Sequence, residues 1–262
     1  MCSMTLFTDG QLNGTIDLQN YENHVLDVAS AEGIDIAGKI ALAQDEIANE
    51  LMMFLLKRLP AVDSQWLPQP AIRQKIGVSD VVATAPLRQW HAHKTLAFIY
   101  RDAYNNQLND RYQGKWNEYE QLAKTSSQNY FRIGVGLVAG PIPKANSPVL
   151  STVAGSGIAS TYYVAVTWVN QAGLEGSPSE VAQMTTATGQ QLSVAAANPP
   201  TNATGWNVYV GHAPNAISLQ NSTPVGIGST WSLSGSLSQG LQPRDGQQPN
   251  WYLVDHRAIE RG

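Results

Sequence analysis

Residues 161–179, TYYVAVTWVNQAGLEGSPS, decide the fold class of the C-terminal half of the chain. Two sets of side chains alternate along this run: Tyr162, Val164, Val166 and Trp168 share one face, and Tyr163, Ala165, Thr167 and Val169 share the other. A period of two is typical of a β-strand, and the Asn-Gln-Ala-Gly sequence that follows is typical of a turn. The stretch therefore predicts a strand, a tight turn and a returning strand.

The neighbouring sequence extends this β pattern over residues 148–235, which are rich in Thr, Ser, Val and Gly. Further strands are expected at 191–195, 206–210, 224–228 and 230–233. The total of about seven short strands is that of an immunoglobulin-like β-sandwich. Because Cys2 is the only cysteine, no internal disulfide can form, and the core must close through Trp168, Trp206 and aliphatic side chains.

The charge distribution divides the chain. Between Lys144 and Arg244 the only charged residues are Glu175 and Glu180, whereas residues 1–146 hold 13 Lys or Arg and 15 Asp or Glu. Such a break in composition indicates a change of architecture, and the expected fold class is two-domain α + β. We expect a helical domain with an N-terminal arm and a closing strand at 1–146, an Ig-like β-sandwich at 147–241, and a C-terminal docking tail at 242–262.

The N-terminal module has helical periodicity. Asp35 is a candidate N-cap, Pro60 ends the first long run, and Thr84 with the proline two residues later marks the next helix start. Residues 1–33 are expected to form an irregular arm or a strand pair. The apolar positions of the first long helix recur at steps of three and four: Ile36, Ile40, Ala43, Ile47, Leu51 and Phe54.

Two further apolar stripes lie downstream, and both have helical spacing. An aromatic stripe of this kind is more often protein core than binding site, although Tyr and Trp are also favoured in protein–protein contacts. Residues 131–137, FRIGVGL, alternate like a strand in which the glycines let backbones approach closely. The first stripe is Leu96, Ile99, Tyr100 and Ala103, and the second is Tyr112, Trp116, Tyr119 and Ala123.

No constellation of residues suggests catalysis or a cofactor. His91 and His93 form the only histidine pair, and residues two apart on a helix point in different directions, so no metal site is expected. The net charge of −4 and the pI near 5.7 give no general attraction for nucleic acid or anionic lipid. No secretory signal and no membrane span are expected. We therefore expect a protein without enzymatic activity.

Four segments of the helical module resemble the head-to-tail adaptor (head-completion or neck) proteins of tailed bacteriophages. The resemblance covers roughly residues 34–146 and rests on the order of a long amphipathic helix, an aromatic-rich helical hairpin and a closing glycine-rich strand. The β module resembles fibronectin type III-like modules and is a departure from the smaller adaptors. The segments are LAFIYRDAY (96–104), NDRYQGKWNEY (109–119), RIGVGL (132–137) and PIP (141–143).

This resemblance implies a structural virion protein that forms a homododecameric ring. The ring would dock on the portal, connect it to the next neck or tail protein, and let double-stranded DNA pass without sequence specificity during ejection; no membrane is involved. The expected subunit interface is Arg101, Asp102, Asp110, Arg111, Tyr112, Trp116 and Tyr119. In the adaptor family terminal extensions dock against the portal, which suggests contacts by Trp251, Tyr252, Leu253 and Arg257.

Several alternatives stay open. The four charged residues of the expected interface could instead be a solvated helix surface, and the tail could be a strand that returns to the chain's own domains. A different class of function is a phage tail or surface adhesin whose β-sandwich binds glycan through Trp231 and Tyr209. A hydrolase is a third class, and it would require a cleft that holds a pair of carboxylates.

Overall fold

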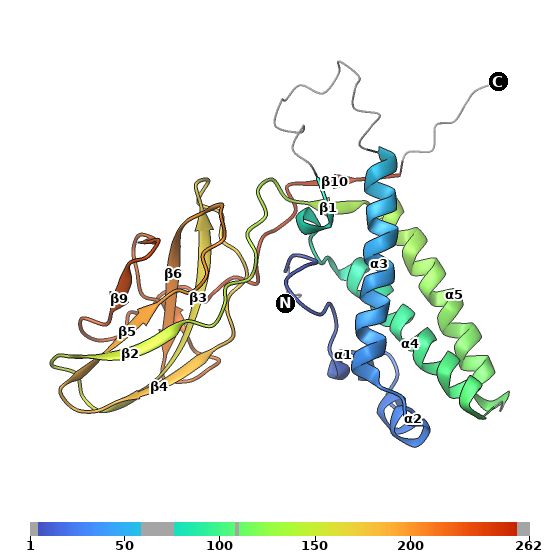
Figure 1. Cartoon of the computed structure of the whole chain (residues 1–262), viewed down its shortest axis with the longest axis horizontal. Coiled ribbons are helices and arrows are strands. Elements are labelled where there is room, and N and C mark those ends of the chain that lie inside the picture. Colours follow the sequence, from blue (N-terminus) through green and yellow to red (C-terminus); the bar gives the residue numbers. More distant parts are fainter. Residues whose placement is uncertain (1–4, 59–75, 108–109, 256–262) are drawn as a thin grey trace, which may run out of the picture. The chain divides into compact units, whose positions relative to one another are not determined.

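The structure is a computed structural model that describes residues 5–58, 76–107 and 110–255 (Figure 1). It has helices in the N-terminal half and β-sheets in the C-terminal half, which is the two-domain α + β class that the sequence predicts. The chain forms two compact units that do not follow chain order. The helical unit comprises Gly10–Val138 and Pro249–Gly262, and the β unit comprises Met1–Asp9 and Ala139–Gln248.

The helical unit is built on three long helices. Helix α3 begins directly after Asp35, whose carbonyl accepts from the Lys39 N–H, and α4 begins directly after Thr84, whose carbonyl accepts from the Arg88 N–H. Both starts are where the sequence predicts them. Helix α4 packs against both α3 and α5. The three helices are α3 (Ile36–Arg58), α4 (Ala85–Gln107) and α5 (Asp110–Ile133), and a 3-10 turn, η3 (Val78–Asp80), precedes α4.

Part of the N-terminal segment is helical, so the prediction of an irregular arm or a strand pair at residues 1–33 is wrong for residues 15–19 and 25–32. Two short helices, α1 (Thr15–Gln19) and α2 (Val25–Glu32), occupy it. Gly14 is the N-cap of α1, and Gly33 ends α2 with a left-handed φ of 64°. The glycines thus mark helix ends, where a left-handed or extended residue is needed, rather than strands.

The core of the helical unit lies where the two apolar stripes of the sequence meet. Leu96 and Ile99 of α4 are fully buried, and the ring of Tyr100 stacks on that of Tyr119 at 5.5 Å between centroids. Fully burying an aliphatic side chain of this size contributes about 1.5–3 kcal/mol. Packing of α4 against its neighbours therefore holds the unit together.

A small sheet closes the helical unit. Strand β1 (Val135–Leu137) pairs antiparallel with β10 (Trp251–Leu253), in a register that sets Gly136 opposite Tyr252. A Cβ on Gly136 would come within 2.9 Å of Pro249 Cγ, so this position requires glycine. The predicted strand at residues 131–137 is confirmed only for its last three residues, because residues 131–133 form the last turn of α5, and Gly136 makes room for side chains rather than for a second backbone.

The β unit consists of two antiparallel sheets that share one core. One sheet has the order β2-β5-β9, and the other has the order β4-β3-β6-β7, with β8 also paired to β6. In the register of β3 and β6, Trp168 lies opposite Trp206, and both indoles are buried. The strands are β2 (Val149–Ala154), β3 (Ser160–Asn170), β4 (Ala182–Thr186), β5 (Gln190–Ala195), β6 (Ala203–Gly211), β7 (Ser218–Leu219), β8 (Val225–Gly226) and β9 (Thr230–Ser232).

A search of the helices in the described part of the chain finds none with the length and hydropathy needed to span a bilayer.

Candidate functional site: a groove between helices α3, α4 and α5

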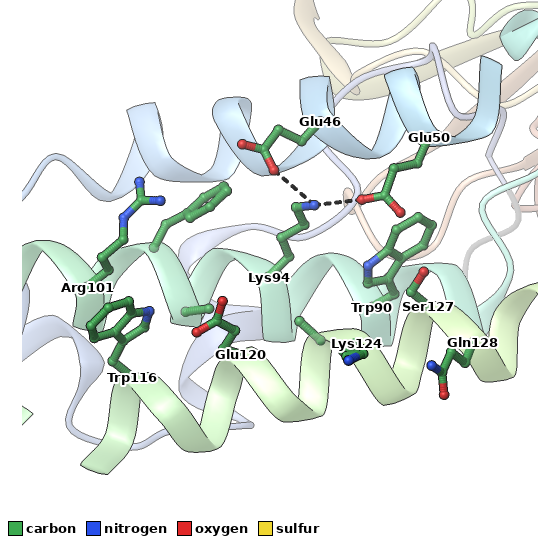
Figure 2. A pocket seen from close by; sticks show the side chains of 13 residues that line it. Glu46, Glu50, Trp90, Lys94, Arg101, Trp116, Glu120, Lys124, Ser127 and Gln128 are labelled. Carbon is green, nitrogen blue, oxygen red and sulfur yellow. Dashed lines mark hydrogen bonds and ion pairs between the residues drawn. The ribbon is translucent and has the colours of Figure 1, made fainter. Parts of the chain in front are cut away.

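The helical unit carries a groove of about 560 Å³ between α3, α4 and α5, which we call the helical groove. Its apolar part includes Trp90 and Phe98 of α4 and Ala123 of α5, all of which are buried against the core. Trp116 of α5 is half-buried, stacks on Tyr104 at 5.8 Å, and completes the apolar surface at one end. Figure 2 shows these side chains together with the polar residues that line the groove.

A partly buried ion-pair cluster lies in the middle of the groove. Lys94 Nζ is 2.9 Å from Glu46 Oε2 and 2.8 Å from Glu50 Oε1, and its side chain is 16% exposed (Figure 2). Burial by itself would lower the pKa of Lys94, but the hydrogen bonds that its ammonium donates to Glu50 and Glu46 outweigh burial and raise the pKa. The amine is therefore a fixed ammonium that ties α3 to α4, and it is unsuited to act as a base or nucleophile.

Two of the other charges along the groove are left unpaired, and a third makes only weak contacts. Within residues 5–58, 76–107 and 110–255, the side chains of Glu120 and Lys124 have neither a hydrogen bond nor an ion pair. The guanidinium of Arg101 lies 4.8 Å from the centroid of the Phe98 ring, and its Nε is 3.8 Å from Asp102 Oδ1. Such an arrangement, apolar below and charged above, is suited to a protein partner.

The solvent-facing side of α3 carries a second feature, which we call the outer stripe: Leu42, Asp45, Asn49, Met53 and Leu56. These residues follow each other at steps of three and four and so lie on one side of the helix. The exposed fractions of the three apolar side chains are 39% for Leu42, 57% for Met53 and 61% for Leu56. The buried face of α3, which includes Ile47 and Leu51, is on the opposite side.

The aromatic residues of the expected subunit interface lie mostly in the core of the helical unit. Tyr112 and Tyr119 are 5% and 4% exposed. The Tyr112 hydroxyl donates to Glu32 Oε1 at 3.0 Å, and the Tyr119 hydroxyl donates to Glu22 Oε2 at 2.9 Å. Only Trp116, in the helical groove, keeps a ring surface that a partner could cover.

The charged residues of the expected interface have mixed environments. Asp102 forms an ion pair with Lys39 of α3. Arg111 is exposed and lies over the Tyr112 ring at 5.2 Å from its centroid. Asp110 is exposed in the first turn of α5, where a carboxylate interacts favourably with the helix dipole.

The expected portal-docking residues belong in part to the chain's own sheet. Trp251, Tyr252 and Leu253 form β10, which is the strand considered as the alternative for the tail. The rings of Trp251 and Tyr252 are still accessible, since these residues are 37% and 51% exposed. Arg257 lies outside the described residues.

The histidine pair is held by hydrogen bonds within the helical unit. His91 is fully buried, its Nδ1 accepts from Asn13 Nδ2 at 2.9 Å, and its Nε2 donates to the Ile40 carbonyl at 3.1 Å. His93 Nδ1 is 2.8 Å from Ser126 Oγ. In the described ranges, no three His, Cys, Asp or Glu residues gather as metal ligands would.

The β unit holds a polar cluster that the sequence does not reveal. Glu175 Oε1 accepts from Thr167 Oγ1, from Asn207 Nδ2 at 3.0 Å and from the Tyr209 hydroxyl at 2.6 Å. Burial, followed by the hydrogen bond to Glu175, raises the pKa of Tyr209. The cluster satisfies polar groups on the face of β3 and β6 that points away from the sandwich core.

The aromatic residues considered for glycan binding are largely covered. Tyr209 is 2% exposed, and Trp231 packs against the sandwich core with part of its surface covered. A stacking platform for a sugar needs an open ring face, so neither residue provides one by itself.

Comparison of the chain with protein-family models, with curated proteins and with solved structures gives no match. The function is therefore inferred from the surfaces of the molecule.

Proposed function

We propose that this protein is a structural virion protein, a ring-forming head-to-tail adaptor that links the portal to the next neck or tail component. The observation that carries the proposal is the outer stripe of α3. Soluble monomers rarely expose several large apolar side chains on one helix face, and methionine is common at protein-binding surfaces. Leu42, Met53 and Leu56 thus favour a helical unit that associates through its sides.

In this proposal the helices of neighbouring copies pack side by side around a channel through which DNA passes. Arg101, Arg111 and Trp116 are exposed or half-buried and contribute to the contacts between copies, together with Asp110. Tyr112 and Tyr119 support those contacts from within the core. No catalytic step belongs to this role.

The β unit is proposed to be an Ig-like sandwich that decorates the ring. Two antiparallel sheets share one core, and the chain changes sheet between β2 and β3, between β4 and β5, and between β5 and β6. Repeated changes of sheet of this kind are found in Ig-like sandwiches. The described charges of its central stretch are used internally, since Glu175 joins the polar cluster and Glu180 pairs with Lys144.

Portal docking is proposed to use the exposed rings of β10. Buried aromatic anchors dominate the binding energy of many interfaces, so replacing one by alanine typically weakens binding about ten-fold or more. We expect Tyr252→Ala to weaken binding to portal rings of the same virus. Tyr21→Ala is the matched control, because Tyr21 is 42% exposed and Tyr252 is 51% exposed.

The test of the proposal is a binding assay with purified portal rings, imaged by electron microscopy. A ring of extra density on one portal face supports the adaptor role. Absence of binding, with the protein located at the tail tip or off the particle, would favour the glycan-binding adhesin instead. Saturable binding of sugar by the full chain, lost on Trp231→Ala, would support that second function.

A further inference from the structure

We propose that the outer stripe of one copy lies in the helical groove of the next copy, with Asp45 of the stripe beside Lys124 of the groove. This inference rests on the proposed function and specifies the contact between subunits. Its occupant is a second copy of this chain, and the stripe and groove are different surfaces. A contact between two different surfaces is heterologous and can close into a ring.

Apolar and polar side chains follow each other in the same order along the outer stripe and along the helical groove. The outer stripe is apolar at Leu42, polar at Asp45 and Asn49, and apolar again at Met53. The groove has Trp116 toward one end, charged side chains such as Lys94 and Glu120 in the middle, and Trp90 toward the other end (Figure 2). From Leu42 to Met53 the stripe rises by eleven residue steps, or about 16 Å, and α4 rises by the same number of steps from Trp90 to Arg101.

Contacts within one copy fix which residues lie at the same height. Lys94 of α4 bonds to Glu46 and Glu50 of α3, and His93 bonds to Ser126 of α5. Positions near 48 on α3 are therefore level with positions near 125 on α5. Helices α3 and α5 run in the same direction, since both are antiparallel to α4; Lys39 pairs with Asp102 and Tyr100 stacks on Tyr119.

A rotation about an axis parallel to these helices moves a copy sideways without shifting it along them. Asn49 of the neighbour then comes to the level of residues 126–127, next to Ser127, and Asp45 comes to the level of residues 122–123, within reach of the long side chain of Lys124. Lys124 has no partner among the described residues, and neither has Asp45. The two opposite charges complement each other, while the more buried Lys94 is already neutralised by its own glutamates.

The contact is tested by disulfide trapping in the full chain with Cys2 replaced by serine. Asn49→Cys and Ser127→Cys together are expected to give a ladder of dimers, trimers and larger species under oxidising conditions. The matched control is Asn49→Cys with Thr125→Cys, because Thr125 is exposed at almost the same height but on a different side of α5. A ladder that is equally strong in the control, a product that stops at dimers, or no intermolecular disulfide would overturn the contact.

A charge exchange tests the pairing without cysteines. Asp45→Arg and Lys124→Glu should each weaken self-association about 1.5- to 5-fold, the range expected for an exposed ion pair. The double variant should recover most of the loss. Equal effects of both single variants without recovery in the double variant would contradict the pairing.

Trapping on the portal separates this inference from the adaptor role. Portal-bound copies that lack the 49–127 disulfide would refute the contact and leave the adaptor role intact. A ladder in concentrated protein that does not bind portal rings would support the contact and refute the adaptor role. If neither the disulfide ladder nor binding to portal rings is observed, both the contact and the adaptor role are refuted.

Discussion

His91 makes the stability of the helical unit depend on pH between about 4 and 6.5. The imidazole is fully buried, and burial, opposed by the hydrogen bond to the Ile40 carbonyl, lowers its pKa from 6.5 to about 4. The nearby charge of Arg88 acts in the same direction as burial. In the unfolded chain the imidazole takes up its proton near pH 6.5, whereas in the folded chain it resists protonation until about pH 4.

Protonation therefore favours the unfolded state throughout this range. The contribution of His91 is fully present above pH 6.5 and is lost as the pH falls toward 4. A pKa difference of this size corresponds to a loss of about 3 kcal/mol of unfolding free energy. The unfolding free energy of a typical domain is about 5–15 kcal/mol, so this loss is a large part of it.

The assay is chemical denaturation followed by circular dichroism at a helix-sensitive wavelength, over a pH series. His91→Gln keeps a donor toward Ile40 but cannot titrate, so its unfolding free energy should fall less steeply between these pH values. His24→Gln is the control, because the His24 side chain is 80% exposed. Identical pH slopes for the wild type and the His91→Gln protein would refute the assignment.

Four further substitutions test the fold. Gly136→Ala should detach β10, because the added methyl would meet Pro249 at 2.9 Å, and hydrogen exchange at residues 251–253 should rise. Gly114→Ala, where nothing lies within 4 Å of the added methyl, should instead stabilise α5 by about 0.5–1 kcal/mol in the same denaturation assay. Glu175→Ala should lower the unfolding free energy of the β unit by about 1–3 kcal/mol, because buried donors lose their acceptor, whereas Glu180→Ala should cost less than about 1 kcal/mol. Unchanged thermal unfolding of the Glu175→Ala protein would contradict this role.

The parts of the fold that the sequence predicts are those with strong local signals. The three- and four-residue steps of α3 and the alternation of β3 each report directly which side chains are buried. The helix starts after Asp35 and Thr84 follow from local capping chemistry. The short helices α1 and α2 are not predicted, because five and eight residues are too few to show a clear helical period, and the glycines that flank them fit a loop or strand pair equally well.

The candidate site is harder to predict, because it depends on contacts between distant residues. The spacing of Tyr112, Trp116 and Tyr119 identifies one helix face, yet only Trp116 borders the groove. Lys94 is one of many lysines in the sequence, and its partners Glu46 and Glu50 are on another helix. The Glu175 cluster joins two strands, so no local pattern marks it.

The pairing of β1 with β10 has a consequence for how the chain is synthesised and rearranged. Leu137 and Trp251 are neighbours across the pair, and antiparallel partners have Cα atoms about 4.5–5.5 Å apart. The two ends of residues 138–250 are therefore adjacent in the structure. We expect that a short hairpin loop in place of these residues would leave the three long helices intact. During translation, β1 can pair with β10 only after residues 138–250 have been synthesised, so the helical unit is completed last.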